Sequence, residues 1–251
     1  MSRLAVFAEQ FPGSPIGEAL AEHREDRAAL LTSFCTSLQD DPRVYAVWLG
    51  GSFGREEADD LSDLDPFIVV DDRAVPEMGA VLRVGAERIG NFLTGAEVSQ
   101  NAPPRGGFFT SLHEGRQGLL HLDCSWQALS AVEEAPERAL LFSRLPEQTT
   151  VLLLNSPPLP PLPSQPSVVP VDLSKEEHTE DGIHFTWMML SIAAKTLARY
   201  PDSDMGLMLY AKPPFEDAAA LLGLEAVAAT ADWSVSEHRQ DKVEWLCRLV
   251  G

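Results

Sequence analysis

The sequence has few of the features that define secreted, membrane or zinc-binding proteins. Its three cysteines, Cys35, Cys124 and Cys247, lie far apart and form no CxxC pair, so neither a disulfide framework nor a zinc site is expected. No apolar run approaches the roughly 18 residues of a membrane span. The apolar stretch 4–8 is too short for the hydrophobic part of a signal peptide. These absences predict a cytoplasmic protein with no membrane partner.

Positive charge is also scarce. The 251 residues include 19 Lys and Arg against 38 Asp and Glu, for a formal charge of −19. Such an excess repels polyanions, so no nucleic-acid partner is expected, and it attracts divalent metals or amine-bearing small molecules. Lysine first occurs at Lys175. Any lysine chemistry therefore has to come from the C-terminal part of the chain.

Proline is concentrated in one segment and marks the predicted domain boundary. Seven of the 19 prolines lie within 157–170. Because proline fixes φ and has no backbone N–H, this stretch favours an extended linker, with a ligand for a proline-binding domain as the alternative. We therefore predict an α/β domain over 1–156, a linker over 157–170 and a helical domain over 171–251.

Hydrophobic periodicity predicts an α+β architecture, a small mixed sheet with flanking helices followed by an α-helical domain. The cap residues and apolar spacing predict helices before the linker over 14–38 and 75–89. The β-rich runs predict strands over 44–49 and 64–70, and a hairpin of strands 108–112 and 119–126 around a turn-like segment, 113–118. After the linker, helices are predicted over 183–200, 214–224 and 234–249.

The segment 45–71, YAVWLGGSFGREEADDLSDLDPFIVVD, contains the residues with the most direct chemical use. A β-rich run ends at Gly50 and Gly51, which allow a sharp turn and a close approach of the backbone to a ligand. Ser52 follows at the start of a predicted helix, where its hydroxyl and backbone N–H groups would bind phosphate oxygens. Taken alone, a Gly-Gly pair after a strand is most simply explained as a turn.

Asp63 and Asp65 form the second part of this segment. On a strand, residues spaced i,i+2 point to the same face, and two carboxylates on one face make a hard oxygen site suited to Mg²⁺ and substrate phosphates. An acidic pair at a strand entrance is, by itself, more often solvated. Pro66 follows directly, and because proline cannot donate to a central ladder, the strand needs an edge-facing N–H or a bulge there.

In this order and spacing, the GS motif, short helix and DxD resemble the signature of the DNA polymerase beta-like nucleotidyltransferase superfamily. The resemblance implies the nucleotidyltransferase fold, Mg²⁺ as the metal and ATP or another NTP as co-substrate. It also implies a third carboxylate on a later strand, a role for which GLLHLDCSW supplies Asp123. A buried acid is costly unless paired or metal-bound. The alternative is an aspartate on the exposed face of a half-buried strand, because His121 alternates with it.

Two basic residues are candidates for binding the triphosphate. Arg55 follows the GS motif closely enough to reach phosphate oxygens; the alternative is a surface arginine paired with Glu56 or Glu57. Lys195 lies in an apolar helix, HFTWMMLSIAAKTLARY. It resembles the basic residue that the helical domain of antibiotic nucleotidyltransferases contributes, whereas the alternative is a lysine that extends to solvent.

The resemblance implies transfer of a nucleoside monophosphate, AMP from ATP, to a hydroxyl of a small molecule such as an aminoglycoside-like or lincosamide-like antibiotic. Two alternatives stay open: a nucleotidyltransferase that modifies a protein, and a nucleotide-binding relic without catalysis. A polymerase or tRNA-end enzyme fits least well, because the net charge of −19 leaves little to hold a phosphate backbone. The predicted site has Asp63, Asp65 and Asp123 as catalytic metal ligands, with Gly51, Ser52, Arg55 and Lys195 binding the nucleotide.

Overall fold

The computed structural model describes residues 14–132, 139–146, 179–199, 212–213 and 216. The chain divides into two compact units, Met1–Pro166 and Ser167–Gly251. The division falls within the proline-rich segment 157–170, which itself lies outside the described residues, as do the helix predicted over 234–249 and nearly all of 214–224. Within the described ranges, no helix combines the length and the apolar composition needed to cross a membrane.

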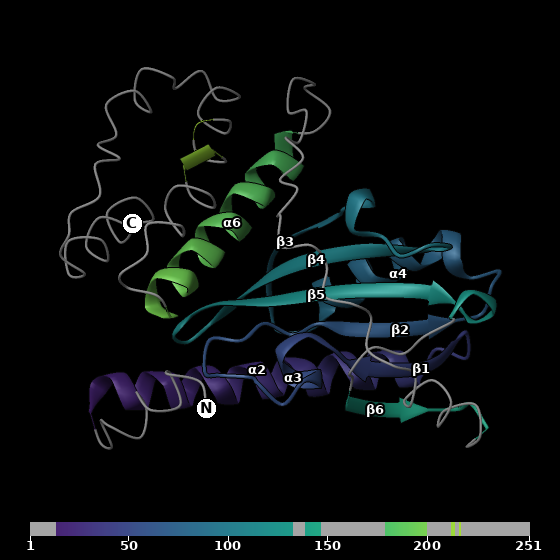
Figure 1. The fold of residues 1–251 in the computed structure, drawn as a ribbon, viewed down its shortest axis with the longest axis horizontal. Coiled ribbons are helices and arrows are strands. Elements are labelled where there is room, and N and C mark those ends of the chain that lie inside the picture. Colours follow the sequence, from purple (N-terminus) through teal and green to yellow (C-terminus); the bar gives the residue numbers. More distant parts are fainter. Residues whose placement is uncertain (1–13, 133–138, 147–178, 200–211, 214–215, 217–251) are drawn as a thin grey trace. The chain divides into compact units, whose positions relative to one another are not determined.

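A six-stranded mixed sheet forms the first unit, with the strand order β3–β4–β5–β2–β1–β6 (Figure 1). Neighbouring strands are antiparallel except for β2 and β5, which are parallel. The predicted mixed sheet is therefore confirmed. The strands are β1 (Val44–Leu49), β2 (Pro66–Val70), β3 (Asn91–Glu97), β4 (Gly106–Gly115), β5 (Gly118–Ala128) and β6 (Ala139–Ser143).

Two of these strands, β3 and β6, were not predicted. The sequence of β3, NFLTGAE, contains Asn and Gly, which are poor strand formers. It is nevertheless extended because it pairs along its length with β4. Strand β6 is short, and among the strands that the structure describes it pairs only with β1. Both are edge strands, whose conformation depends on a neighbour rather than on their own pattern.

The helices of the first unit follow the sequence prediction closely. Helix α2 (Pro15–Gln39) begins after Ser14, whose Oγ accepts a hydrogen bond from the Gly17 amide at 3.2 Å, and Pro at the first helical position fits because it has no N–H to satisfy. Helix α4 spans Val75–Arg88. Both helices bury their apolar residues against one face of the sheet, in a core that includes Leu30, Phe34, Leu38, Val47, Leu64, Ile68, Met78, Leu82, Leu122 and Cys124.

The predicted hairpin is confirmed, but its strands are longer and its turn is shorter than expected. Strands β4 and β5 continue to Gly115 and from Gly118, so only Arg116 and Gln117 connect them. Gly118 has φ 109°, a conformation that glycine adopts without a Cβ clash. Arg116 Nη2 and Nε then reach Glu25 and Asp26 of α2 at 2.9 and 2.8 Å. The turn is thereby attached to the helix.

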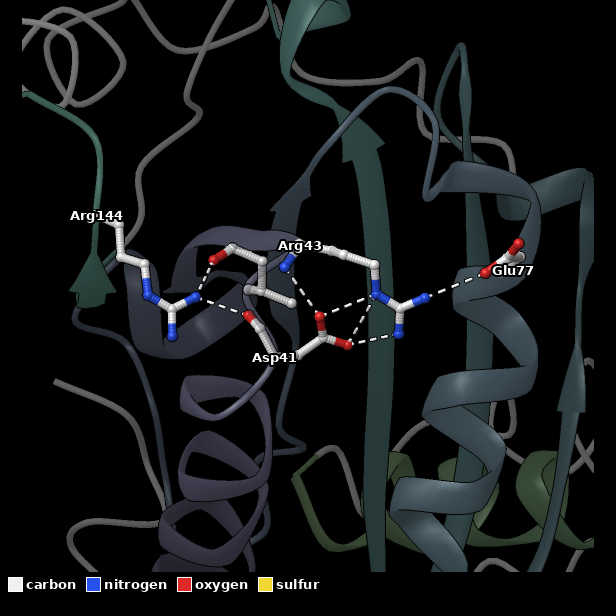
Figure 2. Close-up of polar contacts among 5 residues, drawn as sticks. Asp41, Arg43, Glu77 and Arg144 are labelled. Carbon is white, nitrogen blue, oxygen red and sulfur yellow. Dashed lines mark hydrogen bonds and ion pairs between the residues drawn. The ribbon is translucent and has the colours of Figure 1, made fainter.

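A polar network ties the end of α2 to α4 and to the end of β6 (Figure 2). Asp41 Oδ2 accepts from Arg43 Nη2 at 2.7 Å, and the other terminal nitrogen, Nη1, reaches Glu77 Oε2 on α4 at 3.1 Å. Arg144 Nη1 donates to the carbonyl of Asp41 at 2.7 Å. The side-chain hydrogen bond from Arg43 lowers the pKa of the Asp41 carboxyl below its ordinary value of 3.8.

We expect Arg43→Ala to lower the free energy of unfolding at pH 7 by about 1 kcal/mol, because it removes charge-assisted hydrogen bonds from a partly buried carboxylate. A carboxyl with a lowered folded-state pKa stabilises the protein above its unfolded-state pKa, and this contribution is lost as the pH falls through the folded-state value. The variant should therefore lose less stability than wild type on acidification below about pH 4. Urea titrations from pH 2.5 to 7 would measure this, with the exposed Arg73→Ala as control. If the free energy of unfolding depended on pH in the same way for wild type and Arg43→Ala, the predicted contribution of this ion pair would be contradicted.

Candidate active site

The segment Asp63-Leu64-Asp65 is attached to β5 just before β2 begins. The Leu64 amide donates to the His121 carbonyl at 3.1 Å, and the Asp123 amide donates to the Leu64 carbonyl at 2.8 Å, which pairs Leu64 with Leu122 in a parallel bridge. The strand predicted over 64–70 is therefore shorter in the structure, because Leu64 forms only an isolated bridge. Regular β2 starts at Pro66, at the first strand position, where the missing N–H is tolerated.

All three predicted carboxylates lie on the same face of the sheet. Leu64 and its partner Leu122 belong to the core under the helices, as does Cys124. Because side chains alternate along an extended chain, Asp63, Asp65 and Asp123 point to the opposite face. The parallel bridge also sets the register, which places Asp65 beside Asp123 and Asp63 beside His121. Residues 58 positions apart in sequence therefore become neighbours across two strands.

Two side-chain contacts on this face agree with that register. His121 Nδ1 lies 3.7 Å from Asp63 Oδ1, and Thr110 Oγ1, on β4, donates to Asp123 Oδ1 at 2.6 Å. Thr110 is fully buried, and His121 is almost so. The Thr110 hydroxyl holds the Asp123 carboxylate in one orientation, because a short hydrogen bond to a charged acceptor is strong and directional.

The GS motif contacts the DxD motif directly. The Gly50 amide donates to the Asp65 carbonyl at 2.8 Å. Gly51 has φ 58°, and a Cβ there would overlap Oδ2 of Asp65. Two independent constraints therefore favour glycine at position 51: the left-handed backbone conformation, and the Asp65 carboxylate that occupies the space a Cβ would take. The short helix predicted after the glycine pair is α3 (Gly51–Gly54), a single turn that contains Ser52.

The two predicted basic residues lie in different units of the chain. Arg55 Nε donates to Glu57 Oε2 at 2.8 Å, and both side chains are about half exposed or more, as in the surface alternative. Lys195 lies on α6 (Thr179–Arg199) of the second unit. It is only 8% exposed, so the alternative of a lysine extended into solvent is wrong. Phosphate binding by either residue stays a prediction.

Sequence reasoning missed Arg27 on α2, which lies next to the loop that carries the carboxylates. Arg27 is three residues before Leu30 and seven before Phe34, both core residues, so helical spacing already placed it on the buried stripe. Burial lowers the pKa of its guanidinium, and the nearby carboxylates of Asp60 and Asp59 oppose this. The group nevertheless stays charged, because arginine does not deprotonate in proteins.

The donor chemistry of the carboxylate face fits Mg²⁺. This ion usually keeps several waters and is bound by one or two carboxylates together with substrate phosphates, rather than by an all-protein cage. Asp63 and Asp65 meet that requirement from one face, beside the turn formed by residues 50–52, called the GS turn below. Among the described residues, no three His, Cys, Asp or Glu side chains are arranged to hold a metal by themselves. Metal ligation by Asp123 stays a prediction.

Comparisons with known proteins add little at the level of sequence. No protein-family model matches the chain, and no curated protein matches it. Among solved structures, the chain is similar to the crystal structure of an aminoglycoside 6-adenyltransferase from Bacillus subtilis. The TM-score is 0.32 and the identity 14%, over 85% of this chain and 73% of that one. So low a TM-score does not define a shared function, and the function proposed below rests on the residues of this chain.

If the chain transfers nucleotides with Asp123 in the site, as its motifs predict, Thr110→Val should reduce transfer by about tenfold or more, because removal of a hydrogen bond that orients a ligand side chain typically has this effect. The change is nearly isosteric, so the fold should persist. Turnover and thermal unfolding would be measured on the same preparation. Thr32→Val is the matched control, because that exposed hydroxyl only donates to the Ala28 carbonyl within α2. Equal turnover in the two variants would contradict an orienting role for Thr110.

Proposed function

We propose that this protein is an Mg²⁺-dependent nucleotidyltransferase that transfers a nucleoside monophosphate, AMP from ATP, to a hydroxyl of a small molecule and releases pyrophosphate. The single observation that best supports it is the junction between the GS turn and the carboxylates. The Asp65 carboxylate packs on the Cα of Gly51, and the register with β5 brings Asp123 alongside. A glycine turn packed against a carboxylate suits the close approach of a metal-bound triphosphate.

Each residue has a proposed role that follows from its chemistry. Asp63 and Asp65 would hold Mg²⁺, which when bound neutralises charge on the phosphates. Asp123, oriented by Thr110, would accept the proton of the attacking hydroxyl or share the metal. Ser52 and the amides of the GS turn would donate hydrogen bonds to phosphate oxygens, because donors directed at developing negative charge stabilise the transition state.

Arg55 and Lys195 are proposed to bind the β- and γ-phosphates. Arg55 follows α3 directly, and its present partner, Glu57, is an exposed carboxylate whose ion pair is weak in water. A triphosphate, with several charges, would compete well for the guanidinium. Lys195 lies in a mostly apolar helix of the second unit, and its ammonium would supply a point charge for phosphate oxygens.

The proposed acceptor is a small, amine-bearing molecule such as an aminoglycoside-like or lincosamide-like antibiotic. The formal charge of −19 supports a cationic acceptor over a polyanionic one. The experiment is a pyrophosphate-release screen with each NTP and Mg²⁺ against a panel of aminoglycosides and lincosamides. Turnover with one acceptor, absent without Mg²⁺, would establish the reaction. Transfer to protein but to no small molecule would instead favour the protein-modifying alternative.

A further inference from the structure

Arg27 makes an unusual set of contacts with the loop between α3 and β2. Its Nη1 donates to three backbone carbonyls of that loop, those of Asp59, Asp60 and Ser62, at 3.0, 3.2 and 2.8 Å. The side chain is buried, with 8% exposure. Three convergent carbonyls form a small cation site, and the guanidinium fills it with a charge that the protein cannot remove.

The loop has further polar contacts where Arg27 binds it. Asp59 and Ser62 close a turn, in which the Asp59 amide donates to Ser62 Oγ at 2.8 Å and Ser62 Oγ donates to Asp59 Oδ1 at 3.0 Å. Arg24, one turn earlier on α2, pairs with the buried Asp60 carboxylate at 3.2 Å. The loop is therefore attached to α2 through both its carbonyls and a side chain.

The same guanidinium also contacts the nucleotide-binding turn. The Cζ atom of Arg27 lies 4.9 Å from the ring centroid of Phe53, which stands inside the GSFG sequence of α3. Cations over aromatic faces are attracted by the ring quadrupole. One buried side chain thus touches α3 on one side and, on the other, the carbonyl of Ser62, the residue directly before Asp63.

We propose that Arg27 is a positioning residue that fixes Asp63 and Asp65 relative to the GS turn, by binding the Phe53 ring together with the loop carbonyls of Asp59, Asp60 and Ser62. The inference rests on the proposed function, which assigns these two carboxylates to the metal. Arg27 itself touches no reacting group in this scheme. It acts through the loop, much as residues behind metal ligands hold those ligands in one geometry.

The test uses Mn²⁺ as a spectroscopic probe, with binding to the full chain followed by electron paramagnetic resonance. Arg27→Met keeps the apolar stem and removes the charge, whereas Arg27→Lys keeps a charge without the planar fork. We expect Mn²⁺ affinity to fall about 10- to 100-fold in Arg27→Met, as is typical when a residue that supports a metal ligand is removed. The loss in Arg27→Lys should be smaller. In transfer assays, kcat should fall and the Mg²⁺ concentration needed for activity should rise, and both changes should be larger in Arg27→Met than in Arg27→Lys. Arg116→Gln is the control, because it removes another attachment of α2 without touching this loop.

The outcomes separate the two proposals. Arg27 variants that melt at lower temperature but bind Mn²⁺ and turn over like Arg116→Gln, at a temperature where all are folded, would overturn the positioning role and leave the proposed function standing. Wild-type protein that neither binds Mn²⁺ nor transfers any nucleotide would overturn the proposed function, and the role of Arg27 with it. If Arg27→Met does not fold, Arg27→Lys decides: affinity equal to wild type would overturn the role, and weakened affinity would support it.

Discussion

Asp65→Asn is expected to abolish nucleotide transfer, with a loss of at least about a hundredfold, because in the proposed site it removes a charge that would bind the metal next to the developing transition state. The amide has nearly the same size as the carboxylate, so the packing against Gly51 should persist. Pyrophosphate release and Mn²⁺ affinity would be measured together. Far-ultraviolet circular dichroism and thermal unfolding would show whether the fold is intact.

The matched control is Asp72→Asn, after the other end of β2. Asp72 is a partly exposed carboxylate that pairs with Arg105 at 3.0 Å and accepts a hydrogen bond from the Ser130 amide. Its loss should affect local stability and leave transfer unchanged, since it lies outside the proposed site. Turnover of Asp65→Asn close to that of wild type would show that Asp65 holds no essential metal, whatever the control does.

Gly51→Ala is expected to disable the site and destabilise the protein together. The backbone at φ 58° strains an L-residue by about 1–3 kcal/mol, and the new Cβ would overlap the Asp65 carboxylate. Either the GS turn or Asp65 has to move, and both belong to the proposed site. We expect a lower melting temperature and a loss of transfer of at least about tenfold, as when a ligand's supporting contacts are removed.

Gly85→Ala on α4 is the matched control, because a Cβ is tolerated at that position. A Cβ at Gly85 would meet nothing within 4 Å, and alanine is preferred to glycine within a helix by about 0.5–1 kcal/mol. This variant should be slightly more stable and fully active. A Gly51→Ala protein with normal stability and transfer would contradict both the strain and the contact with Asp65.

The elements with strong local patterns followed from the amino-acid sequence alone. The start of α2, the bounds of β1 and the extent of α4 agree with prediction within a residue or two. Their signals are local: a Ser-Pro cap, a short run of valine, aromatic and other apolar residues, and regular apolar spacing. Edge strands β3 and β6 lack such signals, because pairing with a neighbour determines their conformation.

The candidate site divides in the same way between sequence and structure. Residue types and spacing along one short segment were enough to single out Gly51, Asp63 and Asp65, since turn chemistry and metal preference depend on nearby residues. Only the tertiary structure set Asp123 beside Asp65 through a parallel bridge and placed Thr110 against it. It alone brought the Arg27 guanidinium onto the loop carbonyls. The physical reason is that strand register and helix docking are decided by contacts between residues far apart in the chain, which no local pattern records.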